Sequence, residues 1–190
     1  MLDIGDIPAG LRALDALAKE AEVEVGSAGT VQSGRFLILF GGEVAPVEMS
    51  YRRAVDLLGP AIEDSVLLPH AEERIVPSIM QAQIRWPAAG DTLGVVQTGF
   101  PPTMLRAVDA SLKGAAVQLV ELRVADGLSG RAIATLWGEL FDVEAAIALA
   151  MDAVAQGNAS CGSTSIIPRA DEAVVRAISS GTRFFGEWRG

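Results

Sequence analysis

The sequence is poor in cysteine, histidine and positive charge, and each shortage excludes a class of function. Its 190 residues contain one cysteine, Cys161, and one histidine, His70. A single cysteine cannot form an intrachain disulfide, which fits a protein of the reducing cytoplasm. Neither residue has cysteine or histidine partners at the spacing of a zinc site, so no metal and no catalytic pair are expected.

Positive charge is scarce as well. Fifteen Lys and Arg stand against 24 Asp and Glu, which gives a net charge of −9. No nucleic-acid partner is expected, because such binding depends on Lys and Arg that neutralise phosphates. Without a basic run, no binding to an anionic membrane surface is expected either. The first ten residues lack the pattern of a secretory signal, and no apolar stretch is long enough to span a bilayer.

Half of the residues are hydrophobic, which is enough for a core. Several segments of the sequence occur twice. GRFLILFGGEVAPVE (34–48) returns as GRAIATLWGELFDVE (130–144). LRALDALAKEAEVEV (11–25) returns as LRAVDASLKGAAVQL (105–119) with eight of fifteen positions identical. Average composition would give about one identity by chance. The chain is therefore a tandem duplication.

A third pair of blocks sets the length of the repeat. SVLLPHAEERIVPSI (65–79) resembles TSIIPRADEAVVRAI (164–178), and the block order is the same in both halves. A period this long is a duplicated domain and not a solenoid repeat. Pro and Gly in RWPAAGD (85–91) mark a linker. The predicted domains are residues 1–87 and 88–190.

Each half predicts the same order of elements. A short strand is followed by a helix whose first turn contains Pro8 or Pro102. Two strands joined by a Gly-bearing turn come next, then a second helix, then a fourth strand over 65–69 or 164–168, and a short closing helix. The pattern β-α-β-β-α-β-α is that of an α+β, ferredoxin-like fold with helices on one face of a sheet.

Several of these motifs resemble those of a known family. They are LAKEA or LKGAA at the end of the first helix, GR before an apolar strand, the helix start DVEAA, and IIPRADEAV after the fourth strand. The chain resembles the bacterial microcompartment shell proteins, specifically the tandem-domain kind that forms trimers. The order of blocks in both copies is that of the unpermuted domain.

The resemblance implies a structural protein and not an enzyme. It implies two tandem ferredoxin-like microcompartment domains, and a homotrimer that forms a flat pseudohexameric tile. Tiles of this and other shell proteins would meet edge to edge around a cytoplasmic microcompartment, and small polar metabolites would pass a central pore. Some tandem members carry a cysteine in the first-copy loop that can bind an iron–sulfur cluster. Here the matching residue is Gln32, a poor ligand, so no cofactor is expected.

The same resemblance implies that the loop between the second and third strands of each copy lines the pore. The alternative is an ordinary glycine turn between antiparallel strands. Asp126 would add a ring of three carboxylates on the axis, or would be a solvated loop residue. The predicted pore-lining residues are Thr30, Val31, Gln32, Ser33 and Gly34 in the first copy, and Ala125, Asp126, Gly127, Leu128, Ser129 and Gly130 in the second.

The resemblance also implies four residues at the contact between neighbouring tiles. Lys19 and Lys113 match the family's edge lysine, and Arg169 matches its edge arginine, whose place in the first copy is held by His70. The alternative for the lysines is a solvated position near a helix C-terminus, where a cation complements the helix dipole.

A function of another class also fits the duplication. Two ferredoxin-like halves can bind a small ligand between them, as in a regulator or an enzyme. A polar pocket with a pair of titratable residues would favour that interpretation.

Overall fold

A computed structural model describes residues 1–81, 84–87, 90–125, 127–157 and 162–179. Contacts divide the chain into two compact units, Met1–His70 and Ala71–Gly190. Cys161 and the aromatic segment after residue 179 lie outside the described residues. Each unit is described by itself below.

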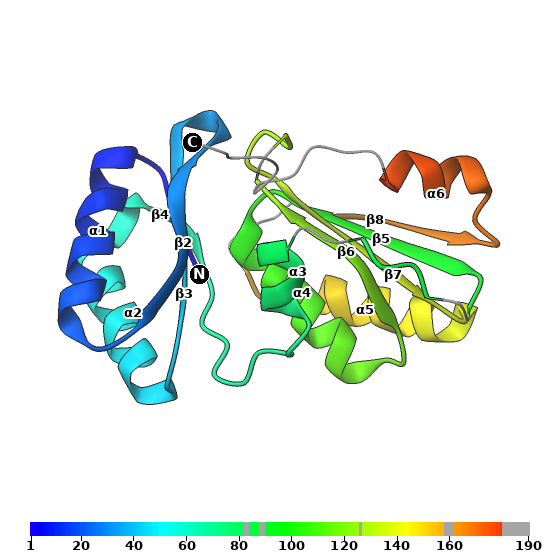
Figure 1. Ribbon diagram of the computed structural model, residues 1–190, viewed down its shortest axis with the longest axis horizontal. Coiled ribbons are helices and arrows are strands. Elements are labelled where there is room, and N and C mark those ends of the chain that lie inside the picture. The colour runs from blue at the N-terminus through cyan, green and yellow to red at the C-terminus, as the bar shows by residue number, and fades with distance from the viewer. Residues whose placement is uncertain (82–83, 88–89, 126, 158–161, 180–190) are drawn as a thin grey trace. The chain divides into compact units, whose positions relative to one another are not determined.

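The first unit is a four-stranded sheet with two helices on one face (Figure 1). The strands are antiparallel and lie in the order β2-β3-β1-β4. A short 3-10 turn, Gln32–Gly34, joins β2 to β3. Its elements are β1 (Leu2–Ile4), α1 (Ile7–Glu20), β2 (Glu24–Val31), β3 (Arg35–Gly41), α2 (Val44–Leu58) and β4 (Ile62–Ser65).

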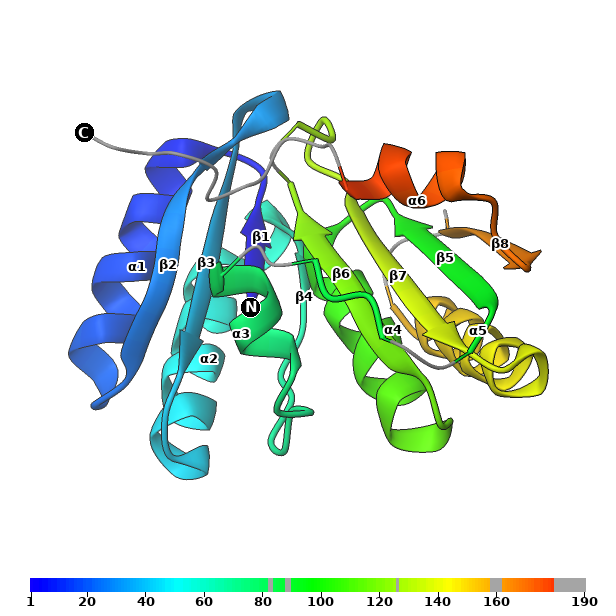
Figure 2. The same cartoon turned by 45° about the vertical axis from the view of Figure 1, so that its right-hand side comes forward.

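The second unit repeats this architecture. Its sheet has the order β6-β7-β5-β8, which is the same order as in the first unit, and α4 and α5 cover one face (Figure 2). The predicted α+β class with two ferredoxin-like copies is therefore confirmed. Its elements are α3 (Ile75–Gln81), β5 (Thr92–Thr98), α4 (Pro101–Gly114), β6 (Gln118–Val124), β7 (Ala132–Gly138), α5 (Leu140–Ala155), β8 (Gly162–Pro168) and α6 (Glu172–Ser179).

Helix α1 shows how the sequence builds the first layer. Asp6 caps its start, because the carboxylate accepts a hydrogen bond from the Ala9 amide over 2.8 Å. Ala13 and Leu17 recur one turn apart and are both fully buried. Their face belongs to a core cluster with Phe36 of β3, so burial against the sheet holds the helix in place.

The fourth strand of the first copy lies earlier than predicted. The prediction was residues 65–69, whereas β4 covers Ile62–Ser65. The reason is its partner: β1 has three residues, and its pairing with β4 runs from Ile4 opposite Ile62 to Leu2 opposite Ser65. In the second copy β5 has seven residues, and β8 covers the predicted 164–168 in full.

Contacts divide the chain before α3, whereas the repeat suggested a boundary after residue 87. Ile75 and Ile79 on α3 are 1% and 3% exposed, and α3 packs against β6 and α4 of the second unit. A helix that the duplication assigns to the first copy thus belongs by contact to the second unit. The boundary after residue 87, which rests on the repeat, stays a prediction.

Gly10 on α1 offers a test of this packing. A methyl group there would overlap the Cβ and ring atoms of Phe36, while Gly29 in β2 has no atom within 4 Å of an added Cβ. We expect Gly10→Ala to lower the free energy of unfolding by about 1–3 kcal/mol, because overpacking forces the helix off the sheet. Gly29→Ala should change it by less than about 0.5 kcal/mol. Urea unfolding of both variants measures this, and equal midpoints would contradict the packing.

Candidate functional site

The loop between β2 and β3 is short and exposed. Gln32, Ser33 and Gly34 form its 3-10 turn, and all three are exposed. Ser33 and Gly34 both have left-handed backbone angles, with φ of 75° and 74°. Gly34 adopts this conformation without cost, whereas Ser33 is held there by the turn. The loop therefore presents a small polar tip of fixed shape.

A buried ion pair anchors the base of this loop. Arg35 follows the turn directly, and its guanidinium lies 3.1 Å from the Asp3 carboxylate in the inner strand β1. Asp3 is fully buried. Burial raises the pKa of Asp3 from 3.8 to about 7, with the nearby Asp64 and Glu63 adding to the rise and Arg35 opposing it. The loop thus begins its return strand from a charged contact inside the sheet.

The loop between β6 and β7 is held differently, by its own backbone. The Ala125 amide donates to the Arg131 carbonyl over 2.7 Å, and the Arg131 amide donates to the Leu128 carbonyl over 3.0 Å. The amides of Leu128 and Gly130 both donate to the Ala125 carbonyl over 3.2 Å. Arg131, which corresponds to Arg35 in the repeat, is exposed. The two loops therefore occupy equivalent positions but have different supports.

The predicted pore-lining residues divide by exposure. Asp126 lies outside the described residues. The side chains of Val31 and Ala125 are buried within the chain, as is Gly130, and Leu128 is half-buried. The residues that reach the surface are Thr30, Gln32, Ser33, Gly34, Gly127 and Ser129. The exposed group is polar or small, and its position on a pore stays a prediction.

The two predicted edge lysines make the same ion pair in both copies. Lys19 lies 2.7 Å from Asp15, and Lys113 lies 2.7 Å from Asp109, each one helical turn away. The side chains of Lys19 and Lys113 are 73% and 47% exposed. The Lys19–Asp15 pair is exposed and contributes at most about 1 kcal/mol to stability, whereas Asp109 is largely buried. Both lysines are exposed enough to contact a neighbouring molecule.

The other two predicted edge residues follow the fourth strands. Arg169 comes directly after β8, is exposed, and has a φ of 50°. His70 lies in the exposed turn that comes after β4. Their position at the edge of a tile stays a prediction.

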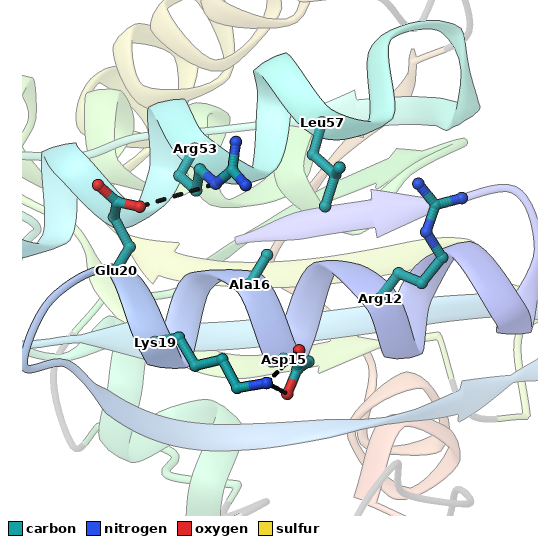
Figure 3. Close-up of a pocket in the computed structure, with 7 residues that line it drawn as sticks. All are labelled: Arg12, Asp15, Ala16, Lys19, Glu20, Arg53 and Leu57. Carbon is teal, nitrogen blue, oxygen red and sulfur yellow. Dashed lines mark hydrogen bonds and ion pairs between the residues drawn. The ribbon is translucent and has the colours of Figure 1, made fainter.

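A surface hollow of about 340 Å³ lies between α1 and α2 (Figure 3). Lys19 lines it together with Arg12 and Arg53, and Arg53 is 3.7 Å from Glu20. Sequence reasoning selected Lys19 and missed the two arginines, although Arg12 recurs as Arg106 in the second copy. The carboxylates of Asp15 and Glu20 line the same hollow and pair with Lys19 and Arg53, so it offers charged groups of both signs to another molecule.

In the described part of the chain, no three side chains of His, Cys, Asp or Glu gather as they would around a metal ion. No described helix is long and apolar enough to cross a membrane.

Comparisons with known proteins agree on one family. The BMC domain model matches residues 1–71 and again residues 92–170. A bacterial microcompartment shell protein, PduT of Citrobacter freundii, is 27% identical over 181 residues, which cover 95% of this chain and 97% of the relative. A solved microcompartment protein from Desulfitobacterium hafniense is 26% identical with a TM-score of 0.76, covering 92% of this chain and 96% of its own. A fused permuted hexameric shell protein of the RMM microcompartment shares the fold, with a TM-score of 0.61, 22% identity, and coverage of 80% of this chain and 82% of its own.

The raised pKa of Asp3 predicts how stability depends on pH. A carboxyl group with a higher pKa in the folded state binds a proton that the unfolded chain has lost, so wild type loses stability as the pH rises from about 4 to 7. Asp3→Asn removes this titration. The unfolding free energy of wild type minus that of the variant should therefore fall over this window, by up to about 1.4 kcal/mol per pH unit, and then level off. Urea titrations between pH 4 and 9 measure the difference, and a flat difference would rule out a raised pKa.

Proposed function

The chain belongs to the BMC-domain family of bacterial microcompartment shell proteins, with one domain in each half, and we propose that three copies close into a pseudohexameric tile. The function is structural: the protein is a shell component. The alternative of a ligand-binding regulator or enzyme has no support in the family match.

The duplication within one chain carries this proposal. Both sheets have the same strand order, and the register of the outer strand shifts at the same place, between Val25 and Ser27 in β2 and between Leu119 and Glu121 in β6. Two such domains present nearly the same edges twice. Head-to-tail contacts between repeated surfaces close into rings, and three chains supply six pseudo-equivalent positions.

The tile has a pore in this proposal. The β2–β3 and β6–β7 loops lie at equivalent positions of the two sheets, so a ring of three chains brings six loops around one axis. Gln32, Ser33 and Ser129 are exposed and neutral, and they offer both hydrogen-bond donors and acceptors. Pore-lining groups of this kind favour small polar solutes over ions. The pore would thus admit small polar metabolites.

The tile also has partners in this proposal. Other shell proteins, and further copies of this tile, would meet it edge to edge around a microcompartment in the cytoplasm. Lys19 and Lys113 would lie at those edges with His70 and Arg169. The lysines are exposed enough to reach a neighbour, and the hollow beside Lys19 offers it charged groups of both signs.

Native mass spectrometry tests the tile directly. We expect a trimer of three times 19.8 kDa, about 59 kDa, or a stacked pair of trimers. A physical reason for the odd number is that two domains per chain fill a six-membered ring only when three chains meet. A stable monomer or dimer at every concentration would overturn the tile.

Lys113→Gln tests the edge. Gln is one bond shorter than Lys and has no charge. Asp109 retains its hydrogen bond from the Glu72 amide, so the fold should be preserved. We expect the variant to keep the native mass of wild type but to form no extended sheets in electron micrographs. Lys113→Arg, which retains the charge, should still form sheets. Intact sheets of the Gln variant would remove Lys113 from the edge.

A further inference from the structure

The segment that leads into α3 is hydrogen-bonded to α4 and β6 of the second unit. The Glu72 amide donates to the Asp109 carboxylate over 2.8 Å. The Arg74 guanidinium donates to the main-chain carbonyls of Leu112, over 3.5 Å, and Val117, over 3.2 Å. These contacts fix where the helix starts on that surface.

Helix α3 then buries one face there. Ile75 and Ile79, one turn apart, are 1% and 3% exposed, and α3 packs against β6 and α4 (Figure 2). Removal of two isoleucine side chains from water stabilises such a contact. The structure thus contains one docked copy of this helix.

Helix α6 is the second copy of the same helix, and it starts with the same turn. In the repeat, Glu72 corresponds to Asp171 and Arg74 to Ala173. The Arg74 amide donates to the Glu72 carboxylate over 3.0 Å, and the Ala173 amide donates to the Asp171 carboxylate over 2.8 Å. The local geometry that sets the direction of α3 is therefore present again at α6.

The docking of α3 is not repeated at α6. Val174 and Ile178 hold the positions of Ile75 and Ile79, but no residue of α6 is buried. The helix lies on the side of the second sheet away from α4 and α5 (Figure 1). An apolar face that is buried in one copy is thus only half-buried in the other.

The surface that would receive α6 is also uncovered. The first unit has the counterpart of the α4 and β6 surface in its helix α1 and strand β2. Three residues of the second unit are buried, at 6–9% exposure: Asp109, Leu112 and Leu119. Their counterparts in the first unit, Asp15, Ala18 and Val25, are all exposed. Val25 is 38% exposed.

We propose that α6 of one chain docks on α1 and β2 of the next chain, as α3 docks on α4 and β6 within one chain. This inference rests on the proposed trimer. Val174 and Ile178 would cover Val25, and the Asp171 amide would donate to Asp15, as the Glu72 amide does to Asp109.

The occupant is a second copy because of the order of domains in a ring. A first domain is followed by the second domain of its own chain, and α3 docks on that domain. A second domain is followed by the first domain of the next chain, so the helix that leaves it meets the neighbour. Each chain would dock its own α6 on one neighbour and would bind α6 of the other neighbour on its α1 and β2. Such a head-to-tail contact forms a closed ring of three chains.

The two docked helices would differ in one respect. Ala173 has no guanidinium to bond the main-chain carbonyls that Arg74 reaches in the other copy. The intermolecular contact therefore depends more on its two apolar side chains than the intramolecular one does. A charge at Ile178 should accordingly disrupt it.

The test compares two variants of α6 by native mass. Ile178→Asp buries a carboxylate in the contact, and we expect the trimer dissociation constant to rise by about tenfold or more. Arg176→Gln changes the net charge by the same single unit on the opposite face of the helix and should remain trimeric. Ile178 is half-buried and Arg176 exposed within the chain, so both variants should remain folded, and urea unfolding checks this.

Mixing two defective chains tests the direction of the contact. Val25→Asp disrupts the surface on α1 and β2 and leaves α6 intact. Ile178→Asp disrupts α6 and leaves that surface intact. Each alone should be monomeric at low micromolar concentration, and an equal mixture should give a heterodimer, since one good contact remains. Trimers of all variants alongside trimeric wild type would overturn the α6 contact and leave the tile standing. A wild type that is not trimeric would overturn both.

Discussion

Burial of one face of each sheet beneath two helices is the interaction on which the rest of the structure depends. It orders the strands identically in both halves and leaves the loops at the ends of the strands and the outer strands, among them β2 and β6, to be covered by other means. An outer strand presents unpaired backbone groups that proteins normally cover. The second unit covers β6 in part, since the Arg85 amide donates to the Val120 carbonyl over 3.0 Å. In the proposed tile, α6 of a neighbouring chain would cover β2.

The two copies of the domain support their equivalent loops in different ways. Arg35 is buried against Asp3, whereas its counterpart Arg131 is exposed and contributes only its backbone to the second loop. A fused chain can evolve its two copies separately, which a ring of six identical subunits cannot. The axis of the proposed tile would therefore be surrounded by two kinds of loop in alternation, one rigid through an ion pair and the other through main-chain hydrogen bonds. Size and polarity of the pore can then be set by each loop independently.

Much of this could be read from the sequence because the signals were local. The repeat, the proline at each helix start and the glycine turns predicted the order of elements and the fold class. The position of β4 could not be read, because Ile62–Ser65 is selected by the three residues of β1 and not by its own composition. Nor could the pairing of Asp3 with Arg35, since 32 residues of chain separate two side chains that the sheet brings within 3.1 Å.

The sequence by itself determined that one domain occurs twice, which family the domain belongs to and where its loops fall. These are properties of residue order, and they survive any arrangement in space. Only the tertiary structure decided which of two matching residues is buried, because burial depends on what lies opposite. Lys19 and Lys113 occupy the same position of the repeat, and each pairs with an aspartate one turn earlier. Asp109 is largely buried because α3 packs against α4, whereas no helix in the described chain packs in the same way over Asp15 on α1.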